Sequence, residues 1–227
     1  MTQETSVRQP GGARTLPLYV VCDASTSMRG EPIDVVNREL REVHRVIAND
    51  PILSDVCRMG VVAFSSEVQI IIPLSKMSHV EVFPPIIAGG QTKLGRLFRE
   101  IEAIIKSDVD GLKSEGRNVV RPVLFFITDG RPTDSWKTSL ATLLDRTRND
   151  YAPNMIAFGV GNAKEDIIQR IGVQRAMMAK KTESVPSALR AVMKSLTQSI
   201  IASARATDLT LKLPEPTDEL RVIDPPR

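Results

Sequence analysis

Short apolar runs alternate along the chain with segments in which apolar residues recur at every third or fourth position. The runs at residues 16–22, 59–64 and 123–128 are typical of strands that are covered on both faces. Further strands are predicted at residues 155–160 and 174–179. Helical spacing follows Gly30 and is carried by Ile33, Val36, Leu40, Val43 and Ile47. The same spacing predicts helices at residues 94–105, 136–148, 163–171 and 189–200.

The order of these elements predicts the fold class. Strands that alternate with helices imply parallel crossovers, and hence a doubly wound α/β sheet with helices on both faces. Only two residues separate the run at 59–64 from the next one at 67–74, so we expect these strands to form an antiparallel hairpin. The sequence therefore predicts a single, mostly parallel sheet with one antiparallel edge strand.

Both ends of the chain depart from this pattern. Residues 1–14 are polar and rich in glycine and proline near their end, which predicts a disordered lead-in. Residues 15–203 carry the alternating strands and helices and form the predicted domain. Residues 204–227 begin with alternating leucines and then become proline-rich, so we expect either an edge strand or a tail that reaches toward a partner.

The composition excludes several classes of protein. With 42% hydrophobic and 25% charged residues, the 227-residue chain has the composition of an ordinary globular protein. The net charge of +3 is too small and too scattered for a nucleic-acid partner, and no apolar run approaches the roughly 20 residues of a membrane span. The N-terminal segment lacks the apolar core of a signal peptide, and two cysteines are too few for a disulfide scaffold. We therefore expect a protein of the reducing cytoplasm.

Oxygen-bearing side chains gather where predicted strands end and long helices begin. Asp23, Ser25 and Ser27 follow the first strand. Thr92 ends the loop before the second long helix, and Asp129 ends the apolar strand VLFFIT. Ligands of open α/β sheets collect at the carboxyl ends of strands, so we expect these side chains to meet. Two carboxylates and three hydroxyls suit Mg²⁺, with Mn²⁺ or Ca²⁺ as alternatives, and suit zinc or copper poorly.

Each part of this set also has a simpler interpretation. The aspartate and serines after the first strand could cap the helix that follows them, and Thr92 could cap the next helix. Asp129 with Gly130 could be a turn. Asp134 is interpreted as a helix cap rather than as a sixth ligand. The position of all three groups at converging strand ends favours the metal site.

The D-x-S-x-S run at Asp23, the later Thr92 and the T-D-G run at Asp129 resemble the metal-ion-dependent adhesion site of von Willebrand factor type A domains. The resemblance covers about residues 16–201, and VVCDASTSMRGEPIDVVN and FITDGRPTD most resemble the bacterial TerY/YegL group associated with tellurite resistance. It implies that the two serines and the threonine contact the metal, while the two aspartates hold it mostly through waters. The remaining position would accept an Asp or Glu carboxylate from a partner protein.

These observations favour a non-enzymatic, Mg²⁺-dependent protein-binding domain. The resemblance implies partners in a tellurium-resistance-type stress response, among them a kinase, a phosphatase or a tellurium-resistance protein. Four residues flank the predicted metal ligands, and we expect them to form a partner-binding rim that attracts acidic segments: Met28, Arg29, Lys93 and Arg131.

Two other functions stay open. Related domains serve ring-shaped ATPases, so the chain could be a subunit of an ATP-driven metal-insertion or remodelling complex whose ATPase is supplied by the partner. Metal-assisted phosphoryl transfer is the weaker alternative. Aspartyl phosphatases on similar folds need a second aspartate two residues after the first, and here that residue is Ser25. We expect no catalytic residue.

Overall fold

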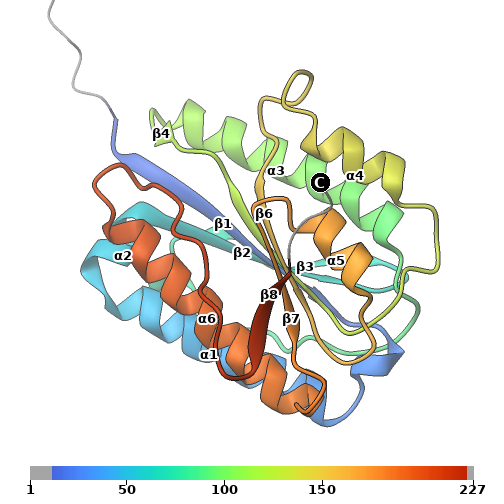
Figure 1. Cartoon of the computed structure of the whole chain (residues 1–227). Coiled ribbons are helices and arrows are strands. Elements are labelled where there is room, and N and C mark those ends of the chain that lie inside the picture. The colour runs from blue at the N-terminus through green and yellow to red at the C-terminus, as the bar shows by residue number, and fades with distance from the viewer. Residues whose placement is uncertain (1–11, 224–227) are drawn as a thin grey trace, which may run out of the picture.

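The computed structural model describes residues 12–223, in which one sheet carries helices on both faces (Figure 1). The strands are β1 (Arg14–Asp23), β2 (Cys57–Phe64), β3 (Val68–Ser75), β4 (Asn118–Val119), β5 (Val123–Thr128), β6 (Asn154–Gly159), β7 (Arg175–Ala179) and β8 (Leu220–Ile223). The α-helices are α1 (Glu31–Asn49), α2 (Pro51–Val56), α3 (Leu94–Ser114), α4 (Lys137–Leu144), α5 (Glu165–Ile171) and α6 (Val185–Arg205). None of these described helices combines the length and the hydropathy that a membrane span requires.

The sheet confirms the predicted fold class. Its strand order is β3-β2-β1-β5-β6-β7-β8, with the short β4 pairing with β1. Within this order the strands from β2 to β7 run parallel, and the hairpin of β2 and β3 closes one edge in the antiparallel sense. At the other edge β8 pairs antiparallel with β7, so the C-terminal segment supplies an edge strand. The order of strands reverses at β1, which lies between β2 and β5.

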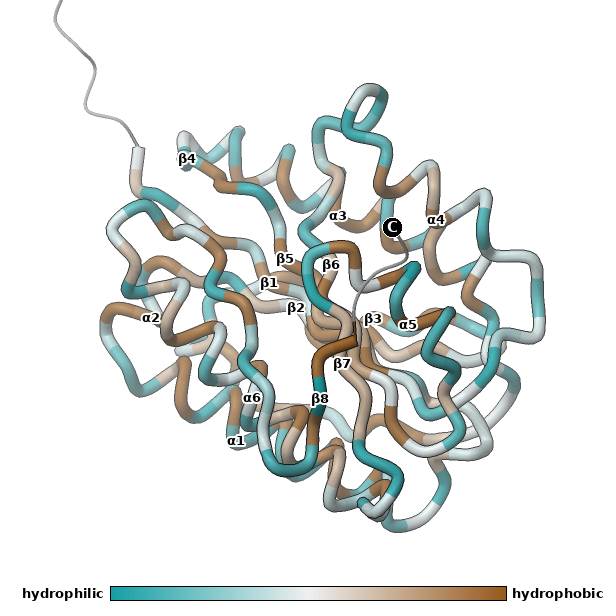
Figure 2. The backbone as a smooth tube through the Cα atoms, in the orientation of Figure 1, coloured by the Kyte–Doolittle hydropathy of each residue, from teal (hydrophilic) through white to brown (hydrophobic). Residues whose placement is uncertain are grey.

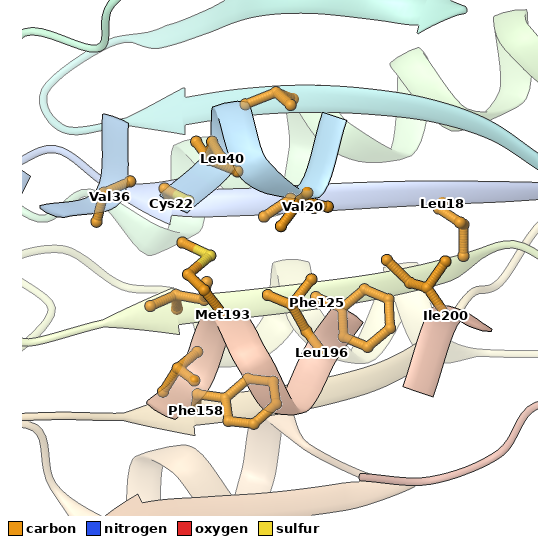
Figure 3. Packing of buried hydrophobic residues seen from close by; sticks show 14 of the residues in the cluster. Leu18, Val20, Cys22, Val36, Leu40, Phe125, Phe158, Met193, Leu196 and Ile200 are labelled. Atoms are coloured by element: carbon orange, nitrogen blue, oxygen red, sulfur yellow. The ribbon is translucent and has the colours of Figure 1, made fainter. Parts of the chain in front are cut away.

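The central strands are buried on both faces, which explains their continuous apolar sequence. Leu18, Val20 and Cys22 of β1 point into the layer formed with α1 and α6 (Figure 3). Tyr19 and Val21 belong to the second core, under α3 and α4. Figure 2 shows the same arrangement, with hydrophobic residues concentrated in the sheet and hydrophilic residues on the outer surfaces.

The structure corrects the predicted elements in three places. The helix predicted at 136–148 ends at Leu144, because the chain turns at Asp145. The alternating leucines at 209–213 form no strand; Leu209 is buried, and the next two leucines pack against the core layer that contains α6. The edge strand lies later, at β8. Of the predicted lead-in, residues 1–11 lie outside the described residues, and β1 already begins at Arg14.

Candidate metal site

Three loops meet at the carboxyl end of the sheet, beside the point where the strand order reverses. Two backbone hydrogen bonds fasten the loop after β1 to the loop before α3. The Gly89 N–H donates to the Ala24 carbonyl at 2.7 Å, and the Thr26 N–H donates to the Gly90 carbonyl at 3.0 Å. The parallel pairing of β1 with β5 brings the third loop to the same place. The topology therefore assembles the site that the strand ends predict.

A chain of hydrogen bonds joins the two serines to Asp129. The Oγ atoms of Ser25 and Ser27 are 3.1 Å apart, and the Ser27 hydroxyl donates to Oδ1 of Asp129 at 2.8 Å. Asp129 is buried, and burial raises the pKa of its carboxyl group while the bond from Ser27 opposes this shift. The structure thus brings these three predicted residues together.

Asp23 is fully buried, and both oxygens of its carboxylate accept hydrogen bonds. The Ser25 N–H donates to Oδ1 at 2.8 Å, and the Thr128 hydroxyl donates to Oδ2 at 2.5 Å. Burial raises the pKa of Asp23 to about 6, although the hydrogen bonds from Thr128 and Ser25 act in the opposite direction. Thr128 was not among the predicted site residues, although a hydroxyl at the end of a buried strand indicates such a positioning role.

The side chains of Thr92 and Asp23 both lie beside Gly130. A Cβ on Gly130 would lie 2.9 Å from Oγ1 of Thr92 and 3.4 Å from Oδ2 of Asp23. A side chain at residue 130 would therefore crowd both the hydroxyl and the carboxylate. Thr92 therefore joins the serines and aspartates at one site, as predicted from the strand ends.

The structure excludes helix capping as the role of the predicted ligands. The N-cap position of α1 is occupied by Gly30, which has no side chain to cap the helix. Ser25 is the N-cap residue of the 3-10 helix that precedes α1, and its side chain makes no capping bond. Lys93, not Thr92, occupies the cap position of α3. The carboxylate of Asp134 accepts from the first backbone N–H groups of α3 at 2.9 Å, so it caps α3 rather than the helix that follows it in the sequence.

The partner-binding rim was predicted to be exposed, which is confirmed for the two arginines and wrong for Met28. Arg29 and Arg131 are exposed, and Lys93 is half-buried. Met28 is fully buried in the core layer with α1, because the 3-10 helix that contains it turns its side chain inward. It is therefore a core residue and cannot contact a partner.

The donor set fits a hard divalent cation. The site opens into a hollow of about 600 Å³, and the residues that line it are Ser25, Thr26, Ser27, Gly90, Gln91, Thr92, Asp129, Gly130, Arg131, Thr133 and Asn162. Within residues 12–223, no group of three or more His, Cys, Asp or Glu side chains is placed to hold a metal. The oxygens at this site come mainly from neutral hydroxyls, which suit Mg²⁺, Mn²⁺ or Ca²⁺ better than softer metals.

Comparison with protein-family models identifies a known domain family. The model described as the von Willebrand factor type A domain matches residues 18–199. Comparison with curated proteins finds none that matches.

Solved structures share the fold. A von Willebrand factor type A protein from Catenulispora acidiphila has a TM-score of 0.58 and 14% identity, over 83% of this chain and 43% of that one. The ArnB paralog VWA2 from Sulfolobus acidocaldarius has a TM-score of 0.54 and 17% identity, over 83% and 46%. The pilus adhesin SpaC from Lactobacillus rhamnosus GG has a TM-score of 0.60 and 15% identity, over 83% and 30%. The chain spans less than half the length of each of these proteins.

Proposed function

The chain belongs to the von Willebrand factor type A domain family, and we propose that it is a metal-dependent protein-binding domain without enzymatic activity. Domains of this family mediate protein–protein interactions. In the proposed complex, a divalent cation, most suitably Mg²⁺, is held by Ser25, Ser27 and Thr92, with Asp23 and Asp129 behind them. The partner supplies an Asp or Glu carboxylate that completes the coordination of the ion.

The main support for this proposal is that the three side chains proposed to contact the ion directly are uncharged hydroxyls. The Ser25, Ser27 and Thr92 hydroxyls converge on the site, while Asp23 is fully buried and already accepts two hydrogen bonds. An ion bound mainly by hydroxyls and waters keeps much of its positive charge. Such an ion attracts a further carboxylate, whereas a cage of carboxylates would satisfy it without a partner.

A role without catalysis is supported by the residues of the hollow. Among the described residues that line it, Asp129 and Arg131 are the ionisable ones. The Asp129 carboxylate accepts the Ser27 hydroxyl and is engaged in the metal site. General acid–base chemistry needs a positioned group that exchanges a proton with the substrate, and the lining offers no histidine or lysine for this task.

The proposed biological setting follows from the sequence resemblance to the TerY/YegL group. We assign the binding activity to residues 15–203, and we place the protein in a tellurium-resistance-type stress response with a kinase, a phosphatase or a tellurium-resistance protein as partner. A cytoplasmic location is supported by Cys22 and Cys57, which are free thiols buried in the core and fit a reducing compartment.

The proposal is tested first with the metal alone. Calorimetric titration of Mg²⁺ into the wild-type protein is expected to show one site, and Thr92→Ala is expected to abolish it. Thr142→Ala is the matched control, because this exposed threonine on α4 bonds only within its own helix. Equal Mg²⁺ binding by wild type and Thr92→Ala would overturn the assignment of the ligands.

The second step tests the partner. Affinity capture from native lysate is run with Mg²⁺, with EDTA, and with Thr92→Ala as bait. A partner that is held only by the wild type in Mg²⁺ supports the proposed function. A partner retained in all three arms means that binding uses another surface.

A further inference from the structure

Exposed apolar side chains gather in one loop that leads to the metal site. Val82 is 73% exposed and Ile87 is 75% exposed, and they are the two most exposed large hydrophobic residues in the described part of the chain. Both lie in the segment 82–87, between β3 and α3, which we call the apolar loop. Single exposed aliphatic residues are common on protein surfaces, so the placement of this pair decides its meaning.

Hydrogen bonds hold the apolar loop in a fixed position along α1. The Asn37 side chain on α1 accepts from the Ile86 N–H at 2.7 Å and donates to the Ile86 carbonyl at 2.9 Å. Ile86 itself is buried in the core beneath α1. The two bonds to Asn37 thus fix the backbone of Ile86, and the next residue, Ile87, is exposed.

The loop continues directly into the metal site. Next to Ile87, the Ala88 carbonyl accepts from Nε of Arg29 at 3.4 Å, and the Gly89 N–H donates to the Ala24 carbonyl beside the first ligand group. Ile87 is two residues before Gly89, which is a span of at most about 7 Å along an extended chain. The exposed isoleucine therefore stands at the edge of the site, next to the exposed Arg29.

We propose that the apolar loop is the specificity surface of this domain, and that it binds an aliphatic side chain of the same partner segment that supplies the carboxylate. The inference rests on the proposed function. A partner in extended conformation advances about 3.5 Å per residue, so its aliphatic residue lies one or two positions from its Asp or Glu. Arg29 beside the loop favours an acidic segment and disfavours one with a lysine at that position.

The binding energy of this contact comes from the burial of apolar surface on Ile87 and on the partner's aliphatic side chain. Ile87 is rigidly presented, so little conformational freedom is lost when a partner covers it. Covering an isoleucine with one leucine is expected to strengthen binding roughly tenfold relative to serine at the same partner position. The carboxylate contributes the dependence on metal, and the aliphatic residue contributes the choice among acidic segments.

The test uses an array of synthetic peptides with a central Asp. The residues one and two positions away are Leu, Ser or Lys, and binding is measured in Mg²⁺ and in EDTA. Wild type is compared with Ile87→Ser and Val82→Ser. The matched control is Ile70→Ser on β3, an exposed isoleucine on a strand at the edge of the sheet. Melting temperatures confirm that each variant is folded.

The expected result is Mg²⁺-dependent binding of Asp peptides with a roughly tenfold preference for Leu over Ser. This preference falls to within about twofold in Ile87→Ser and persists in Ile70→Ser. Mg²⁺-dependent binding without a Leu preference, or a preference that survives in Ile87→Ser, overturns the inference and leaves the proposed function standing. Absence of any Mg²⁺-dependent binding overturns both.

Discussion

Replacing the buried Asp23 by asparagine is expected to stabilise the metal-free protein at neutral pH while destroying its response to metal. Burial raises the pKa of this carboxyl group from 3.8 to about 6. Each unit of pKa corresponds to 1.36 kcal/mol, so the ionised carboxylate costs the folded state about 3 kcal/mol relative to the unfolded state. The amide in the Asp23→Asn variant would carry no charge and would avoid this cost.

The upward shift of the Asp23 pKa determines how the free energy of unfolding changes with pH. A group whose pKa is higher in the folded state contributes its full stability below the unfolded pKa, near 4. That contribution is lost as the pH rises through the folded value of about 6. Because the carboxyl group of the unfolded chain is already partly ionised at pH 4, the gain from Asp23→Asn is expected to grow by about 2 kcal/mol between pH 4 and pH 7.5.

The assay is urea denaturation in EDTA at these two pH values, with the free energy of unfolding compared between wild type and Asp23→Asn. The hydrogen bonds from Ser25 and Thr128 favour the ionised carboxylate, and the pKa of about 6 already includes their effect. Asp145→Asn is the control of opposite sign, because hydrogen bonds from Thr147 lower the pKa of that carboxyl group. A difference between wild type and Asp23→Asn that does not change with pH would refute the reasoning. Mg²⁺ should restore the stability of the wild type at pH 7.5 and leave the variant unchanged.

Three further substitutions distinguish effects on the proposed metal site from effects on the stability of the surrounding fold. Gly130→Ala is expected to weaken Mg²⁺ binding at least tenfold in calorimetry with little change in melting temperature, because its Cβ would lie 2.9 Å from Oγ1 of Thr92. Asp134→Ala should cost about 1 kcal/mol in urea denaturation through the lost cap of α3, with Mg²⁺ affinity within about twofold of wild type. Met28→Ala should cost about 2–5 kcal/mol because it opens a cavity in the core, and an unchanged free energy of unfolding would contradict its burial.

The sequence predicted the fold because its strands are buried on both faces and therefore appear as uninterrupted apolar runs. The run Val123–Thr128 lies where VLFFIT predicts it, and the two-residue link at Ser65 correctly predicts the hairpin of β2 and β3. The short α2 and β4 were not predicted, because six residues and two residues are too few to show a period.

The positions of the residues around the site were harder to predict than the convergence of its candidate ligands. Asp23, Ser25 and Asp129 occupy strand ends, and topology alone brings strand ends together. Met28 was placed on the surface because it follows the ligand loop, but a single 3-10 turn reverses the direction of its side chain. Asp134 was correctly interpreted as a cap, yet the helix that it caps begins 40 residues earlier, since such a contact depends on packing and not on sequence spacing.

The candidate site takes oxygen donors from the ends of two neighbouring strands, β1 and β5, that are far apart in the sequence. This separation affects the kinetics of folding. The Thr128 hydroxyl and the Asp23 carboxylate are separated by 105 residues, and they meet only after β5 has docked against β1. Contacts of such long range form late, after the cost of closing the chain has been met. The proposed metal ion would find its complete site only after that step, so we expect it to leave the folding rate nearly unchanged and to slow unfolding. Binding of the proposed metal ion would thus lengthen the lifetime of the native state by slowing the separation of β5 from β1.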